Sequence, residues 1–272
     1  MKFYHVCVTM ALLSSTQVMH SFWNTWIDTI VTKINNTTEL IMHKEFDKAQ
    51  LIAINNEQGA VIINSWKQKT IALEIITTAP QATIKDINID IECIDNSIKI
   101  HTTFLDSKIK GSVLFNILVP HDTNITIKTK QGDIVVKDVY GTLDLATGAG
   151  DIKLLNPHDN LQAHTGNGLI CMRTDSMQAD KICNLETDKG NIEFYTTATS
   201  NTHVHACAPQ GKITSDIPIT LSSKTTKLDA AAWKEFRQTA DGSIGTPASA
   251  LHMTAHNGCI AILPYTKQND IF

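Results

Sequence analysis

The chain lacks a strong excess of charge of either sign. Its 272 residues include 23 Lys and Arg against 27 Asp and Glu, which gives a formal net charge of -4. A basic surface that could neutralise nucleic-acid phosphates is therefore not expected, and nucleic acid is excluded as a partner. The chain has only 7 prolines and 13 glycines, which excludes a collagen-like protein or a long disordered linker.

Sequence motifs of catalysis are also missing. The chain contains no GxSxG nucleophile elbow, no HExxH zinc motif, no phosphate-binding P-loop and no GxGxxG between a strand and a helix. We therefore expect a protein that is not an enzyme and that needs no cofactor.

Cysteines are few and irregularly spaced. Cys7 lies in the N-terminal apolar segment, and the remaining five form no CxxC pair. An odd number at irregular spacing does not indicate a disulfide framework or a structural zinc ribbon. If the protein is exported, we expect at least one thiol to stay free or to pair between chains.

The abundant residues are β-branched. The chain contains 34 Ile and 33 Thr, and both residue types favour strands. The composition therefore predicts an all-β protein.

The N-terminus has the layout of a targeting segment. Lys2 precedes a mostly apolar stretch that ends at Leu13, and small polar residues follow. Residues 1–21 are therefore predicted to be a signal peptide or an N-terminal anchor, with a buried first helix or strand as the alternative. This predicts a secreted, periplasmic or cell-surface protein, in which only the N-terminal segment could associate with a membrane.

Residues 22–45 are predicted to form an amphipathic helix or cap. Apolar residues from Trp23 to Ile34 recur at steps of three and four, which is typical of one helix face. The alternative is a helix that lies in a membrane interface through its tryptophans.

One short pattern recurs from residue 127 onward. An apolar residue, a small Thr or Ala and then Gly-x-Ile return in register, with the glycines at positions 132, 150, 168, 190, 211 and 258. A unit of about 20 residues cannot bury its own apolar face, but stacked units can. The repeat predicts a β-solenoid or β-helix-like stack of short strands, with apolar residues facing one interior. An antiparallel meander or sandwich is the competing architecture.

The predicted repeat domain covers residues 46–264. Its regular repeats begin at about residue 125, an insertion loop occupies 222–247 and includes a short helix over 228–236, and 265–272 form a C-terminal tail. Residues 46–126 alternate like strands but lack the glycine pattern.

Residues 46–264 resemble an exported "putative adhesin" family of β-strand-repeat proteins. The resemblance rests on Ile52–Val61 and Trp66, on Val119–Ile134, on Tyr140–Ile152 and on Gly245–Ile262. It implies a β-solenoid-like fold, export and no known catalysis, and it supplies no functional residues. The long insertion, the cysteine and histidine content and the residues Leu169 and Cys259 after their glycines depart from the family pattern.

Two sets of side chains are candidates for chemistry. Asp133 and Asp151 follow their glycines in adjacent repeats, where they could act in acid–base chemistry, bind Ca²⁺ or be solvated corner residues.

The second set consists of histidines, a cysteine and a glutamate. Imidazole and thiolate ligands suit Zn²⁺ or Cu. A metal site is predicted from His203, His205, Cys207, Glu186 and His252, and an ordinary exposed polar face is its alternative.

The sequence favours a non-enzymatic, exported interaction module, adhesin-like, that binds protein or glycan through extended sheet faces. One alternative is a polysaccharide-active enzyme on a β-helix. Another is a scaffold of the cell envelope that self-associates through the ends of its stack.

Overall fold

The computed structural model describes residues 29–34, 37–222 and 238–266. Its strands form two sheets of 11 strands each, and the all-β prediction is confirmed. Sheet A contains, in spatial order, β1 (Thr29–Ile34), β2 (Thr37–Phe46), β5 (Ile71–Pro80), β8 (Ser112–Pro120), β4 (Val61–Trp66), β10 (Ile134–Lys137), β12 (Ile152–Leu155), β14 (Ile170–Arg173), β16 (Ile192–Thr196), β22 (Ile260–Pro264) and β18 (Ile213–Ser215). Sheet B contains, in spatial order, β19 (Thr220–Leu221), β20 (Thr239–Ile244), β17 (Thr202–Cys207), β21 (Ser249–Asn257), β15 (Ile182–Lys189), β13 (Leu161–Asn167), β11 (Leu143–Ala149), β9 (Asn124–Gln131), β3 (Leu51–Gln58), β7 (Ser97–Phe104) and β6 (Ile87–Ile94).

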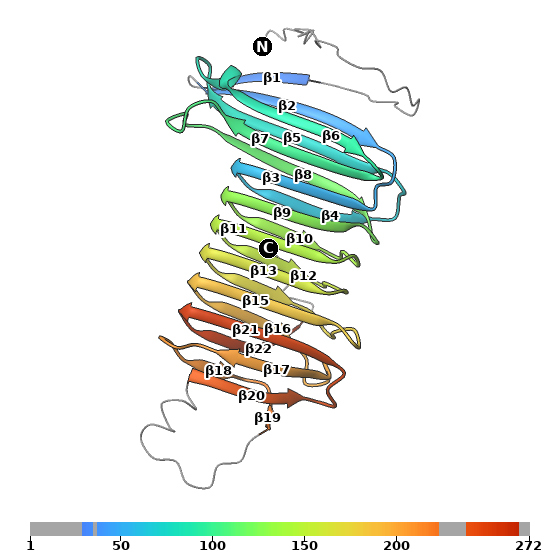
Figure 1. The fold of residues 1–272 in the computed structure, drawn as a ribbon, viewed down its shortest axis with the longest axis vertical. Helices are drawn as coiled ribbons and strands as arrows, with labels where there is room; N and C mark the ends of the chain where they lie inside the picture. Colours follow the sequence, from blue (N-terminus) through green and yellow to red (C-terminus); the bar gives the residue numbers. More distant parts are fainter. Residues whose placement is uncertain (1–28, 35–36, 223–237, 267–272) are drawn as a thin grey trace.

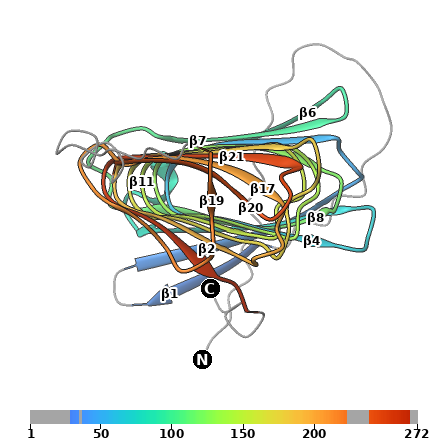
Figure 2. The ribbon, with the colours of Figure 1, turned by 90° about the horizontal axis from the view of Figure 1, so that it is seen from below.

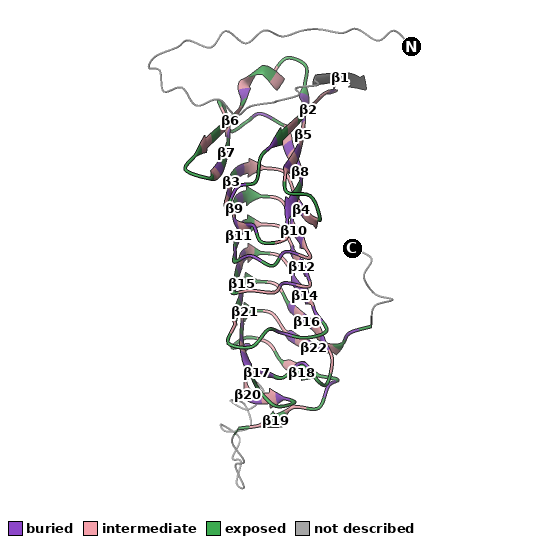
Figure 3. Ribbon diagram, turned by 90° about the vertical axis from the view of Figure 1, so that its right-hand side faces the viewer, coloured by how far each residue is buried: buried purple, intermediate pink, exposed green. Residues whose placement is uncertain are grey.

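The two sheets face each other over the whole length of an elongated molecule (Figures 1 and 3). In each repeat unit a strand of sheet B runs across a glycine into a strand of sheet A, as β11 runs into β12. Successive units stack in parallel and in register, so that Ile134 pairs with Ile152 and Ile152 pairs with Ile170. Viewed along the stack, the units overlie one another around a flat interior (Figure 2).

The interior is filled by the apolar positions of the repeat. Leu145, Ile152 and Leu154 are all at most 1% exposed, and the equivalent residues of the neighbouring units are buried with them. Because side chains alternate along a strand, the residues between them face outward on each sheet. The core therefore uses one face of each sheet and leaves the other face to solvent.

At the glycine corner, the backbones of successive units approach each other closely. Gly150 has a φ of +148°, and a Cβ atom there would lie 2.2 Å from the carbonyl oxygen of Gly132 in the preceding unit. The same carbonyl accepts a hydrogen bond from the buried Thr147 hydroxyl at 2.9 Å. In the units of β11, β13 and β15, the small Thr and the Gly thus serve one purpose, which is to bring successive corners into contact without leaving the carbonyl unpaired.

The predicted N-terminal helix is wrong where the structure tests it. Residues 29–34 form strand β1, which pairs antiparallel with β2. All its residues except Lys33 are β-branched, and such side chains disfavour a helix and favour a strand. Residues 37–45 of the predicted cap belong to β2, and residues 22–28 lie outside the described residues.

The order of the units along the chain differs from their order in space. Strands β21 and β22 lie between the β15–β16 unit and the β17–β18 unit, although they come last in the chain. At the other end, β3 and β4 lie between the β7–β8 pair and the β9–β10 unit. The repeats share one register, so a unit that comes late in the sequence can occupy an inner position if its connection is long enough.

The predicted insertion loop over 222–247 needs correction. Residues 239–244 form β20, which pairs antiparallel with β17 and β19. Thr239, Ala240 and Ile244 can extend the sheet there because β17 leaves an open edge on the side away from β21. The predicted helix over 228–236 lies outside the described residues.

The remaining predicted boundaries are only partly covered. The signal peptide or anchor over 1–21 lies outside the described residues, and the sheets begin before residue 46, at β1. Tyr265, assigned to the tail, is 9% exposed, and its backbone N–H donates to the Thr196 carbonyl at 2.8 Å. In the part of the chain that the structure describes, no helix is long and apolar enough to span a bilayer.

Candidate functional site

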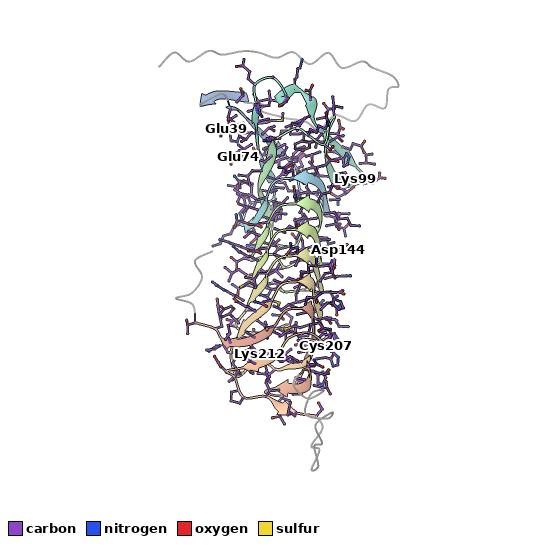
Figure 4. The ribbon with its side chains drawn as sticks, turned by 90° about the vertical axis from the view of Figure 1, so that its left-hand side faces the viewer. Glu39, Glu74, Lys99, Asp144, Cys207 and Lys212 are labelled. Carbon is purple, nitrogen blue, oxygen red and sulfur yellow. The ribbon has the colours of Figure 1, made fainter. Side chains whose placement is uncertain are left out.

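The outer face of sheet B carries a concentration of histidines and carboxylates toward the C-terminal end of the stack. We call it the histidine face; it comprises His164 on β13, Glu186 and Asp188 on β15, His203 and His205 on β17, Asp241 on β20, and His252 and His256 on β21. The labels of Lys99, Asp144 and Cys207 mark this side of the molecule in Figure 4, opposite those of Glu39 and Glu74 on sheet A. Strand alternation places these side chains outward, since the residues between them are buried.

Four of these residues form two crossed contacts between an imidazole and a carboxylate, and we call these four residues the quartet. His164 Nε2 lies 3.5 Å from Asp188 Oδ1, and His256 Nε2 lies 2.9 Å from Glu186 Oε1. His164 is the register partner of Glu186 on the adjacent strand, so both pairs run diagonally across β13, β15 and β21. The four side chains are between 40% and 54% exposed, which leaves their polar atoms accessible from solvent.

A second group of the histidine face lies next to the quartet. His203 Nε2 and His205 Nδ1 lie 3.2 and 3.8 Å from the same oxygen of Asp241. His205 is also the register partner of His252, with ring centroids 6.0 Å apart. This group therefore combines three imidazoles with one carboxylate.

The predicted metal-binding residues are only partly brought together. His203, His205 and His252 do share a surface, and Cys207 lies on the same strand as the first two. Glu186, however, is not a neighbour of Cys207, because β21 lies between their strands and Thr254 pairs with both. The structure therefore separates Glu186 from the other predicted ligand Cys207, because the last unit of the chain lies between their units.

Sequence reasoning missed four residues of the histidine face. His164 occupies the same place before Gly168 as Glu186 does before Gly190, so the repeat register alone could have paired them. Asp188 lies on the same strand as Glu186 and on the same face, so the alternation of that strand could also have predicted it. His256 could not be found in this way, because its place beside β15 depends on the displaced last unit. Asp241 was hidden in the segment predicted as a loop.

The two candidate carboxylates of the glycine corner have structural partners. The Oδ1 atom of Asp133 accepts the backbone N–H of Asp151 at 2.8 Å, and the Oδ1 atom of Asp151 accepts that of Leu169 at 2.9 Å. Asn191 does the same for the N–H of Cys259. Where Asp or Asn follows the glycine, as at positions 133, 151 and 191, its side chain therefore satisfies a backbone N–H of the next unit.

The five described cysteines form no disulfide with one another. Burial raises the pKa of the Cys183 thiol to about 12, and it also raises the pKa of Cys171. Burial therefore disfavours the thiolate of both residues, and the thiolate is the form that binds metals and acts as a nucleophile. Cys207 is partly exposed at the margin of the histidine face.

A shallow groove lies at the opposite end of sheet B. It has a volume of about 620 Å³ and runs between the hairpin of β6 and β7 and the outward side chains of β3 and β9. Its charged and imidazole side chains are Asp90 and Glu92 on β6, Lys99 and His101 on β7, and Lys128 on β9. The groove is open along its length and offers both signs of charge to a polar ligand.

Comparisons with known proteins give only distant likenesses. No family model matches the chain, and no curated protein matches it. A solved structure named a "putative cell adhesion protein", from Clostridium sporogenes, is 13% identical over 89% of this chain and 100% of that chain, with a TM-score of 0.45. A "putative adhesin" from Bacteroides fragilis is 14% identical over 82% and 97%, with a TM-score of 0.44. A "putative lipid binding protein" from Parabacteroides distasonis is 9% identical over 81% and 96%, with a TM-score of 0.24. At these scores the likenesses establish neither a shared family nor a shared function.

Proposed function

We propose that the chain is an exported β-solenoid that works as a non-enzymatic interaction module, with the outer face of sheet B as its binding surface. The partner is a protein or a glycan at the cell envelope or surface. The observation that carries the proposal is the parallel, in-register stacking of β9, β11, β13, β15 and β21, which lays equivalent outward residues side by side on one long face.

The chemistry of this face suits a polar partner. Asp144, Gln162 and Asn184 are register partners in successive strands, and all three are exposed. A row of hydrogen-bonding groups at the spacing of neighbouring strands, about 4.8 Å, can follow an extended chain of sugars or a peptide backbone. The apolar residues of the same strands point inward, so the outward residues can be substituted without disturbing the core.

The ends of the stack favour binding by the face over polymerisation end to end. Antiparallel strands β1, β2 and β5 terminate sheet A on the N-terminal side, β6 terminates sheet B there, and β20 and β19 terminate sheet B on the other side. At these ends an antiparallel strand interrupts the parallel, in-register stacking by which the units of the repeat pair with one another. Among the strands that the structure describes, only β18, three residues long, ends a sheet in parallel pairing.

The proposal is tested by comparing substitutions on the outer face of sheet B with substitutions on the outer face of sheet A. The labelled full chain is applied to intact cells and to glycan arrays, beside a variant in which Asp144, Gln162 and Asn184 are all alanine. The matched control replaces Lys153 and Glu193, which lie on the outer side of sheet A. We expect the sheet B variant to lose binding at an unchanged melting temperature and the control to retain it.

Two results would overturn the proposal. One is that the wild-type chain binds neither cells nor any glycan, and the other is that the sheet A control loses binding as much as the sheet B variant. Release of shortened products from an acidic polysaccharide would instead indicate the enzymatic alternative. Protease treatment of intact and lysed cells that express the protein tests export, since an exported surface protein is digested before lysis.

A further inference from the structure

The quartet has the composition of a transition-metal site. Two imidazole nitrogens and two carboxylates converge from three adjacent strands, with His164 on β13, Glu186 and Asp188 on β15, and His256 on β21. Nitrogen ligands with carboxylate oxygens are typical of Zn²⁺ and its neighbours in the first transition row. Hard cations such as Ca²⁺ and Mg²⁺ prefer sites built from oxygen alone.

The distances between the potential ligand atoms are close to those of a bound ion. One ligand atom each from His164, Glu186 and Asp188 lie within 4.8 Å of one another, and His256 Nε2 is 2.9 Å from Glu186 Oε1. Ligands about 2.0–2.2 Å from a tetrahedral ion are about 3.3–3.6 Å apart. Closure of these three groups around an ion therefore needs movements of about 1 Å, which half-exposed side chains can make by small rotations about their χ angles. His256 lies outside this group of three and joins it as the fourth ligand through a rotation of its imidazole from Glu186 toward the ion.

The scaffold limits how far the four groups can separate. Their strands pair in register through β13, β15 and β21, and the residues between them, such as Thr165, Thr187 and Ala255, are buried. A metal site built on the interior strands of a sheet is better ordered than one built on loops. In the structure each imidazole already faces a carboxylate, so the arrangement supplies the negative charge that a divalent ion requires.

We propose that His164, Glu186, Asp188 and His256 bind one divalent transition-metal ion of the Zn²⁺ type on the outer face of sheet B. The imidazole nitrogens and the carboxylate oxygens replace their mutual contacts with bonds to the ion, and any proton on a ligating nitrogen is released to solvent while the other ring nitrogen keeps its hydrogen. The proposed site differs from the metal site predicted from the sequence, because Glu186 here binds the ion together with the other three residues of the quartet. It is independent of the proposed binding function, since the ion can be measured without the partner.

The test is a calorimetric titration of the full chain, without a histidine tag, with Zn²⁺, supported by the visible absorption of Co²⁺. The quartet variant is His164→Ala with His256→Ala, and the matched control is His203→Ala with His205→Ala, which removes two histidines from the same face. We expect one ion per chain for the wild type and the control, and a loss of affinity of at least about tenfold for the quartet variant. Zn²⁺ should raise the melting temperature of the wild type and of the control but not that of the quartet variant.

The outcomes separate the possible sites. Absence of stoichiometric binding by the wild type would overturn the proposal. Loss of binding in the control with retention in the quartet variant would also overturn it and would assign the ion to His203, His205 and His252 instead. Melting temperatures without metal show whether each variant is folded, and single variants His164→Asn and His256→Asn repeat the comparison if a double variant is unstable.

Discussion

Substitution of Gly150 by alanine tests the close contact between successive units. The added Cβ would lie 2.2 Å from the carbonyl oxygen of Gly132, and the φ of +148° at Gly150 is one that side-chain-bearing residues rarely adopt. An ordinary contact between these atoms is about 1 Å longer, so the two units must move apart or the corner must rearrange.

The magnitude follows from the hydrogen bonds at this corner. Four of them link the two units at 2.8–2.9 Å: the N–H of Gly132 to Ala149, the N–H of Ile134 to Asp151, the Thr147 hydroxyl to Gly132, and the N–H of Asp151 to Asp133. A displacement of about 1 Å takes them beyond bonding distance, at a net cost of about 0.5–1.5 kcal/mol each. With about 1–3 kcal/mol for the backbone conformation, the sum is about 3–9 kcal/mol. Because the corner can relax, we expect a loss in the lower part of this range, about 3–6 kcal/mol.

Urea unfolding followed by circular dichroism measures this loss. The control is Asp144→Ala, because Asp144 is exposed on β11 in the same unit and should change stability by less than about 0.5 kcal/mol. The melting temperature of the glycine variant should fall by about 2–4 °C per kcal/mol. A change below about 1 kcal/mol in the glycine variant would refute the reasoning, since it would mean that the units are not in contact at this carbonyl.

Three further predictions concern the core and the thiols. Thr165→Val removes the hydroxyl that donates to the Gly150 carbonyl at 2.8 Å and should cost about 1–3 kcal/mol in urea unfolding, because a part-buried acceptor loses its partner. Ile152→Asp places a charge at a position that is 0% exposed, and it should prevent folding or cost at least about 4 kcal/mol, as judged by soluble yield and melting. Iodoacetamide at pH 8, read by peptide mass spectrometry, should modify the partly exposed Cys259 but not Cys183 until the chain is unfolded. A thiol pKa of about 12 leaves Cys183 about one part in ten thousand thiolate at that pH. Unchanged stability of Thr165→Val would contradict the first prediction. An Ile152→Asp variant that is no less stable than Lys153→Asp would contradict the second, and equal labelling of Cys183 and Cys259 in the native state would contradict the third.

Local periodicity was sufficient to predict the strands of the repeat and their register. The positions of Ile134, Ile152 and Ile170 relative to their glycines predicted that they would align, and the structure pairs them in that way. Period-two alternation and the glycine corner are properties of a few neighbouring residues, so they can be read from one segment at a time. The same reasoning failed at residues 29–34, where the spacing of the apolar residues predicted a helix, but the β-branched residues form a strand.

The sequence by itself determined the all-β class, the inward residues and the glycine corners, because each depends on the conformation of a short segment. Only the tertiary structure decided which units are neighbours. Repeats with a common register can pair with one another in many orders, and the choice depends on long connections and on packing across the whole stack. That choice separated Glu186 from Cys207 and placed His256 beside it, so the candidate metal site became visible only when the fold was known.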